Sequence, residues 1–292
     1  MKFRKILAGL AAASVCALAV CSGCRAGAGS PAGSAPASGT SGGPDAGVLF
    51  REAKTAAETM KSCEATFSSS LVFTAGEKRH SFRSGGSAVF TAEPFALRSV
   101  RSSQEDGLSG RAETYTVAEN GSLWFYGRGA DGAWRKAEEP GLDTSPLAQI
   151  EILGLLNSAE QEKYVRETQA DSRPAHKIEL RLKSEVLRST IETVAAASGI
   201  GSGSRTLVQA LLESAPPVYA YAYIDARDGR LLRLELDAAD TVDRLFRGID
   251  GSSVKIRVSE CSVSGGLSKV NGAPPVRLPD EVQKAAAVQA QG

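Results

Sequence analysis

Apolar and polar residues alternate along several segments of this chain, and turn-forming dipeptides separate these segments. In 232–237 leucines alternate with charged residues, and 177–182 and 254–259 alternate in the same way. A period of two puts the apolar side chains of a strand on one face and the polar ones on the other. Asn-Gly and Asp-Gly supply the positive φ angles of hairpin turns. Such dipeptides lie between the strand-like runs at Asn120-Gly121, Asp131-Gly132 and Asp228-Gly229. The pattern therefore predicts an antiparallel sheet with one apolar, dry face and one polar, wet face.

Four further segments carry the apolar spacing of helices instead. They are 48–61, for which Asp45 is a suitable N-cap, 147–157, 184–197 and 204–214. The elements run helix, many strands, helix, two strands, two helices, hairpin and final strand, which indicates the α+β class. The apolar face of a long sheet must be buried from solvent by other elements. We therefore expect a single curved antiparallel β-sheet, a half-barrel, with two to four helices packed on its concave face.

The chain begins with the pattern of a secretory leader. Three basic residues precede an apolar run over 6–20, which is shorter than the roughly 20 residues that span a bilayer. Residues 21–24 read "CSGC", which resembles a bacterial lipobox except that Cys21 stands where leucine is usual. We expect a lipoprotein signal peptide over 1–23 and lipid attachment at Cys24.

Other interpretations of this leader remain open. Ordinary secretion would place the cleavage near Gly23 or Ala26, and an uncleaved leader would remain as an anchor. A metal pair at Cys21 and Cys24 would need two further ligands, and the chain has no second Cys-x-x-Cys.

A tether follows the leader. Residues 25–46 are almost all Gly, Ala, Ser or Pro, a composition that stays disordered because it cannot bury apolar surface. Such a linker spans roughly 25 Å. The predicted organisation is a lipidated, disordered segment over 24–46, a half-barrel domain over 47–286 and a disordered tail over 287–292. Lipid at Cys24 would hold the domain at the extracytoplasmic face of the cell membrane.

The charge balance disfavours a nucleic-acid partner. The chain has 34 basic and 33 acidic side chains, and loss of the leader leaves 31 basic against 33 acidic. Nucleic-acid binding favours a basic face, and no polybasic membrane patch is present either.

Cys63 and Cys261 are the two cysteines beyond the leader, and a disulfide between them is one possibility. It would close a loop of about 200 residues and stabilise the fold by roughly 4–5 kcal/mol in the chain-entropy model. The other possibility is two thiols. Cys63 is in phase with the apolar side of its strand, whereas Cys261 is in phase with Lys255 and Arg257.

No segment carries the motif of a catalytic or metal site. The chain has no Gly-x-Ser-x-Gly elbow, phosphate-binding loop or HExxH, and His80 and His176 lie in polar stretches that predict solvated side chains. Four aromatic residues could form a sugar platform, but their place beside a hairpin favours cross-strand packing; they are Trp124, Phe125, Tyr126 and Trp134. We expect no enzyme, no cofactor and no metal.

Four stretches resemble a group of lipoproteins from Gram-positive bacteria that carry a domain of unknown function: "AAETMKSCEATFSSSLVF", "YTVAENGSLWFYGRGADGAWRKAE", "YAYIDARDGRLLRLELDAAD" and "APPVRLPDEVQKA". That domain is similar to Lol-type lipoprotein carriers and to mycobacterial lipoproteins that carry glycolipids. The resemblance spans about 48–286. It implies a half-barrel with helices against its concave face, where carriers of this shape hold acyl chains. It transfers no binding residue.

The dry face and the predicted site beside a membrane favour binding of a lipid or another apolar ligand. Phe67, Leu71 and Phe73 are the expected lining residues. The alternative is a non-enzymatic interaction or sensor module of the cell envelope in which the helices fill the concavity. The sequence predicts neither the ligand's identity nor the oligomeric state.

Overall fold

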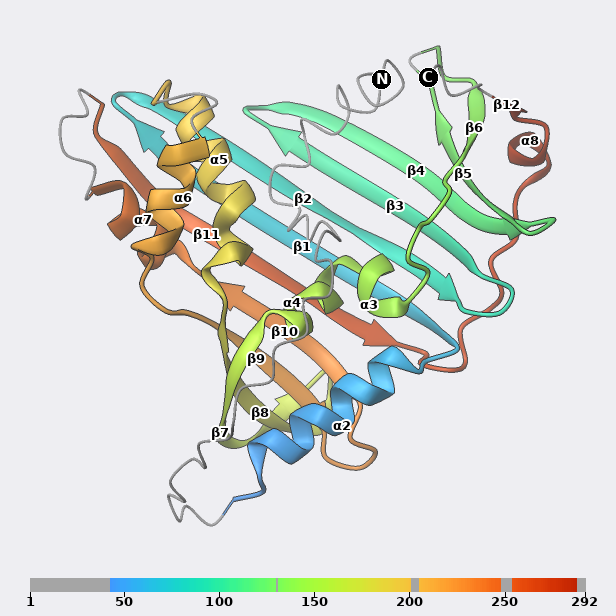
Figure 1. The fold of residues 1–292 in the computed structure, drawn as a ribbon, viewed down its shortest axis with the longest axis horizontal. Coiled ribbons are helices and arrows are strands. Elements are labelled where there is room, and N and C mark those ends of the chain that lie inside the picture. The colour runs from blue at the N-terminus through green and yellow to red at the C-terminus, as the bar shows by residue number, and fades with distance from the viewer. Residues whose placement is uncertain (1–42, 130, 201–204, 248–253, 288–292) are drawn as a thin grey trace.

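The computed structural model describes residues 43–129, 131–200, 205–247 and 254–287 (Figure 1). The predicted signal peptide, Cys24, most of the tether and residues 288–292 lie outside the described residues. The described part of the chain begins close to the start of the first predicted helix. The Asp45 side chain accepts a hydrogen bond from the Val48 amide at 3.1 Å, which caps a helix that begins at Ala46.

One sheet of twelve strands organises the molecule. Its order is β12-β6-β5-β4-β3-β2-β1-β11-β10-β9-β8-β7. All neighbouring strands are antiparallel except β12, which runs parallel to β6, so the predicted single antiparallel sheet is confirmed and it is not closed. The strands are β1 (Ser62–Ala75), β2 (Lys78–Thr91), β3 (Ala96–Glu105), β4 (Leu108–Glu119), β5 (Ser122–Arg128), β6 (Trp134–Glu138), β7 (Ala159–Ala170), β8 (Arg173–Leu182), β9 (Val218–Asp225), β10 (Leu231–Asp237), β11 (Ile256–Ser268) and β12 (Ala286–Ala287).

Several helices pack on one face of this sheet. In Figure 1, α2, α3, α4, α5 and α6 lie in front of the strands, and α7 packs against β11. The helices are α2 (Ala46–Glu58), α3 (Pro146–Gln149), η1 (Glu151–Leu153), α4 (Gly154–Asn157), η2 (Ser184–Leu187), α5 (Arg188–Ala197), α6 (Arg205–Glu213), α7 (Ala239–Arg247) and α8 (Asp280–Gln283). The predicted helix over 147–157 is broken because Ile150 adopts an extended conformation, and α7 and α8 were not predicted.

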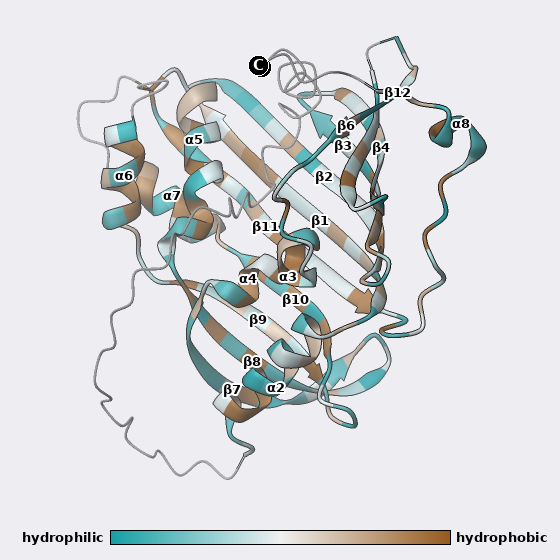
Figure 2. Cartoon of the chain, turned by 45° about the vertical axis from the view of Figure 1, so that its right-hand side comes forward, coloured by the Kyte–Doolittle hydropathy of each residue, from teal (hydrophilic) through white to brown (hydrophobic). Residues whose placement is uncertain are grey.

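The main core lies between these helices and the face of the sheet that we call the covered face. Its apolar residues come from β1, β2 and β8–β11 and from α2, α4, α5, α6 and α7. Figure 2 shows brown and teal bands alternating along the strands, as the sequence period requires. Leu71, Phe73, Ile178 and Leu234 are fully buried there.

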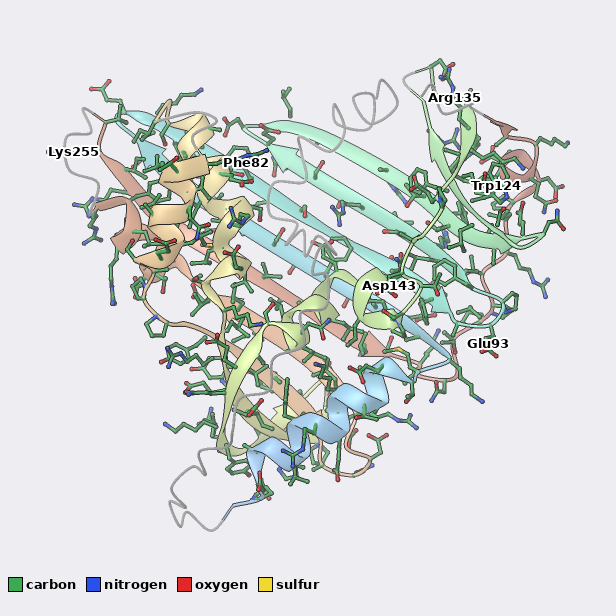
Figure 3. All side chains as sticks on the ribbon, in the orientation of Figure 1. Phe82, Glu93, Trp124, Arg135, Asp143 and Lys255 are labelled. Atoms are coloured by element: carbon green, nitrogen blue, oxygen red, sulfur yellow. The ribbon has the colours of Figure 1, made fainter. Side chains whose placement is uncertain are left out.

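A second, smaller core lies on the opposite face, which we call the open face. Tyr115, Tyr126 and Trp134 pack beneath Val282 of α8, and Trp134 meets Tyr115 edge-on at 5.8 Å. Figures 1 and 3 show this end of the sheet, with Trp124 on β5 far from Phe82 beside α5. Tyr126 and Trp134 are only 1% and 8% exposed, so they pack across strands and offer no platform to a sugar.

The sheet and its cores form a complete body. All residues of the three core clusters, including a small one around Leu232, lie between Phe50 and Ala285. Residues 43–292, which keep the Asp45 cap and are called the body below, therefore contain a core of their own.

No helix in the described part of the chain is both long and apolar enough to cross a bilayer.

The structure contradicts the possible disulfide. Neither Cys63 nor Cys261 is disulfide-bonded. Cys261 lies opposite Leu71, eight residues along β1 from Cys63, which separates the two cysteines by about 26 Å. Disulfides need Cα atoms within about 7 Å of each other.

The phase of Cys261 is explained by a β-bulge. The register between β1 and β11 shifts at Val72/Phe73, so Ser259 is an extra residue between Val258 and Glu260. One extra residue reverses the alternation. Cys261 therefore joins the buried covered face although it is in phase with Lys255 and Arg257 in the sequence.

The Cys63 thiol should resist alkylation in the folded protein. Burial raises its pKa to about 12, and the Glu64 carboxylate adds to this effect. The thiolate is the nucleophile, so at pH 8 we expect no iodoacetamide adduct at Cys63 in native protein and full labelling in denaturant. Peptide mass mapping measures both, and fast native labelling would contradict the burial.

Candidate functional site

A cavity of about 60 Å³ lies on the covered face between the sheet and the segment that links β6 to β7. Strands β1, β2 and β3 form its floor, and α3 with η1 forms its roof. Ala65, Phe67, Ala88, Leu97, Ile150 and Ile152 supply an apolar lining, to which Ser99, Arg101, Gln149 and Glu151 add polar groups. Phe67, Leu97 and Arg101 are half-buried, so solvent reaches the cavity.

Two glycines make room for this arrangement. Phe67 lies directly opposite Gly86 on β2 and Gly265 on β11. A Cβ at residue 265 would lie 3.0 Å from Ile152 Cγ1 and 2.5 Å from the Thr66 carbonyl oxygen. A Cβ at residue 86 would lie 2.9 Å from Phe67 Cζ. Glycine is thus required for η1 and the Phe67 ring to approach the sheet.

Arg101 continues the same row of the sheet, opposite Gly86 on β3. Its guanidinium carbon lies 5.0 Å from the centroid of the Phe67 ring, a cation–π arrangement. The guanidinium also forms an ion pair with the Glu151 carboxylate. The two side chains are 26% and 19% exposed. Burial raises the pKa of Glu151 above its usual value, and the charge of Arg101 opposes this shift.

The roof is a set of short helical turns, α3, η1 and α4, which we call the closing segment (Pro146–Asn157). Asp143 precedes it and lies beside α3 in Figure 3. The Asp143 side chain accepts the Ser145 amide at 2.8 Å, and its carbonyl accepts the Gln149 side-chain amide. Leucine and isoleucine side chains anchor the segment in the main core: Leu147, Ile150, Ile152, Leu153, Leu155 and Leu156.

Of the three lining residues predicted from the sequence, Phe67 lines the cavity. Leu71 and Phe73 are fully buried in the main core, where Phe73 stacks on His80 and Phe82 at 5.0 and 6.1 Å. Arg101 and Glu151 were missed. Arg101 has a signal in the sequence, because it is in phase with Leu97 and so falls on the side of β3 expected to be dry.

His80 is also placed differently from the prediction. It is 3% exposed, not solvated, and its Nδ1 lies 2.9 Å from Asp106 Oδ2. The Asp106 carboxylate accepts the Ser81 amide at 2.7 Å as well, so a polar turn holds this histidine against Phe73. Among the described residues, no three His, Cys, Asp or Glu side chains are grouped to hold a metal.

A larger depression of about 280 Å³ lies on the open face across β1, β10 and β11. Thr66, Ser68, Asp171 and Arg233 line it together with Ser264. The Ser68 and Ser264 hydroxyls hydrogen-bond each other at 2.8 Å, and Arg233 pairs with Glu235 at 2.7 Å. These polar walls do not suit an apolar ligand.

No protein-family model matches this chain, and no curated protein matches it. Several solved structures do. The crystal structure of LprF from Mycobacterium bovis is 12% identical, with 81% of this chain and 96% of that chain covered and a TM-score of 0.42. Lipoprotein LppX from Mycobacterium tuberculosis is 13% identical, with 80% and 100% covered and a TM-score of 0.41.

A LolA superfamily protein from Nitrosomonas europaea is 12% identical, with 82% of this chain and 97% of that chain covered and a TM-score of 0.20. The chain is thus similar to mycobacterial lipoproteins and to LolA superfamily proteins. The part of the expected resemblance that concerns mycobacterial and Lol-type lipoproteins is confirmed. At this identity and these TM-scores, the likeness says nothing about a ligand.

Proposed function

We propose that this chain is a cell-envelope lipoprotein whose body binds a lipid or another apolar ligand at the covered-face cavity. In this proposal Cys24 carries the acyl chains, the residues up to 45 form the tether, and the body lies on the extracytoplasmic side of the membrane. The role is binding and not catalysis. Incorporation of labelled palmitate into the full chain, and its loss in Cys24→Ala, tests the tether.

The observation that carries the proposal is an apolar cavity at the edge of the helical cover. In Figure 1 no described helix lies over β4 or over most of β3. Half-buried apolar side chains continue from the cavity across this part of the covered face: Leu97, Leu123 and Phe125. Burial of such surface by an acyl chain contributes about 25 cal/mol per Å².

The cavity must enlarge to hold a ligand. Its 60 Å³ compares with about 300–1,000 Å³ for ligand pockets. The closing segment is the element that can make this space. It consists of three short helical turns over the cavity, and none of its residues belongs to a strand of the sheet. Movement of α3 and η1 away from β1–β3 would join the cavity to the part of the covered face, over β3 and β4, that no described helix covers.

Binding of Nile red, an uncharged apolar dye, tests the cavity. We expect the body to raise its fluorescence saturably, and Phe67→Ser to weaken the affinity about tenfold, since the ring forms part of the floor. Leu108→Ser is the matched control, because Leu108 is 79% exposed and does not line the cavity. Equal affinities for all three proteins would contradict a site at Phe67.

The extent of the main core favours one alternative, an interaction or sensor module with a filled interior. Leu71, Phe73, Ile191 and Val194 are fully buried between α5 and the sheet, which leaves that half of the covered face closed. If the body binds neither Nile red nor membrane lipid, this alternative replaces the carrier.

A further inference from the structure

Arg101 and Glu151 are the two charged residues among the described residues that line the cavity, and their side chains form an ion pair. Arg101 comes from β3 and Glu151 from η1, fifty residues apart. The pair therefore joins the floor of the cavity to its roof. Apolar contacts of Ile150 and Ile152 already hold the roof in place, so the ion pair is not needed to attach it.

The environment of the pair disfavours the carboxylate more than the guanidinium. Arg101 lies over the Phe67 ring, which favours a cation there. Glu151 is mostly buried, and burial raises its pKa although Arg101 opposes the shift. Replacement of a buried ion pair by well-packed apolar residues is often neutral or stabilising, so this pair is poorly explained by stability alone.

We propose that Glu151 occupies the place of a ligand's acid group, and that the ligand is an anionic amphiphile whose acid group binds Arg101 while its chain lies along the apolar lining. This inference rests on the proposed function and deepens it by naming the ligand class. The planar guanidinium binds a carboxylate or a phosphate with paired hydrogen bonds. Entry of the ligand's acid group displaces the Glu151 side chain into solvent and removes the ion pair that joins η1 to β3.

The geometry gives the ligand a defined direction. The acid group lies at Arg101, in the row formed by Phe67, Gly86 and Arg101. The apolar chain then follows Leu97 toward Phe125 on the uncovered part of the covered face, where both side chains are half-buried. Phosphatidylcholine and other ligands without net charge would lack the contact that replaces Glu151.

The test measures the affinity of the body for a fluorescent fatty acid, 11-dansylaminoundecanoic acid, and for its methyl ester. For the unaltered body we expect the acid to bind at least tenfold more tightly than the ester. Glu151→Gln should strengthen acid binding about three- to tenfold and leave the ester unchanged, because the amide does not compete with the ligand's charge. A gain in affinity cannot result from misfolding.

Arg101→Gln should abolish the preference for the acid while the ester still binds. Arg98→Gln is the matched control. Arg98 lies on the open face of the same strand and pairs with Glu113 at 2.8 Å, so its loss should change neither affinity. Thermal unfolding of each variant confirms that it is folded.

The outcomes separate the inference from the proposed function. If acid and ester bind equally, or if Glu151→Gln weakens acid binding, the inference is wrong while the carrier stands. If neither probe binds the unaltered body, the inference is wrong, and the proposed function fails with it if Nile red and membrane lipid do not bind either. Where the acid probe binds, competition with decanoate and with dihexanoyl phosphatidic acid identifies the acid group that Arg101 accepts. Displacement by decanoate alone indicates that the site binds carboxylates, and displacement by both indicates that it binds phosphates as well.

Discussion

Gly86→Ala should destabilise the body by about 3 kcal/mol, at the upper end of the usual cost of overpacking. The new Cβ would overlap the Val100 carbonyl oxygen and lie 2.9 Å from Phe67 Cζ and 3.1 Å from Arg101 Cα. Two of these neighbours are backbone atoms, which cannot rotate away. For a body of this size we expect the melting temperature to fall by roughly 6–12 °C, measured by circular dichroism.

Gly110→Ala is the matched control for this substitution. Gly110 also lies within a strand, β4, and a Cβ there would meet only the Ser103 hydroxyl, at 3.3 Å. Its free energy of unfolding should change by no more than about 0.5 kcal/mol. If the two glycine variants melt together, the close approach of Phe67, Gly86 and Arg101 is wrong.

Asp243→Ala should cost about 2–3 kcal/mol, the penalty for a buried donor that loses its acceptor. Asp243 is 5% exposed on α7, and its Oδ1 accepts the Val258 amide at 2.8 Å beside the bulge of β11. The side chain also pairs with Arg247 and, at 3.9 Å, Arg257. Both arginines are more than half exposed, so these ion pairs contribute little.

Two variants separate the hydrogen bond from the charge. Asp243→Asn keeps an acceptor oxygen, so we expect most of the stability to be retained in urea denaturation. Asp240→Ala removes an exposed carboxylate from the first turn of the same helix and should cost less than about 1 kcal/mol. A loss for Asp243→Asn equal to that for Asp243→Ala would mean that the charge, and not the amide bond, holds α7 on the sheet.

Local patterns in the sequence predict much of this fold. The strands follow from alternation, and the hairpin at Asn120-Gly121 follows from its turn chemistry: the two residues have φ angles of 51° and 80°. The α+β class and the single antiparallel sheet can therefore be predicted from the sequence alone. Amphipathic spacing likewise predicts α2, α5 and α6.

Features that depend on distant residues could not be predicted in this way. The bulge that turns Cys261 inward is defined by pairing with β1, almost 200 residues earlier. The packing of Val282 on Trp134 depends on the return of the C-terminal segment across the open face. Glu151 meets Arg101 only because Ile150 interrupts a helix that spacing predicts to be continuous.

The candidate site was only partly predicted for the same reason. Phe67 was identified because alternation puts it on the dry side of β1. Leu71 and Phe73 share that side, but α5 and the neighbouring Phe82 of β2 bury them. What distinguishes Phe67 is the pair of glycines opposite it on two different strands, and this arrangement appears only once the strands are placed side by side.

Native mass spectrometry of the body, purified without detergent, shows whether this protein carries a membrane lipid. We expect a noncovalent adduct with the mass of a membrane amphiphile, lost on extraction with organic solvent and diminished in Phe67→Ser but not in Leu108→Ser. A mass equal to that of the polypeptide alone, unchanged after incubation with membrane lipid extract, would contradict the carrier and favour the filled interaction module.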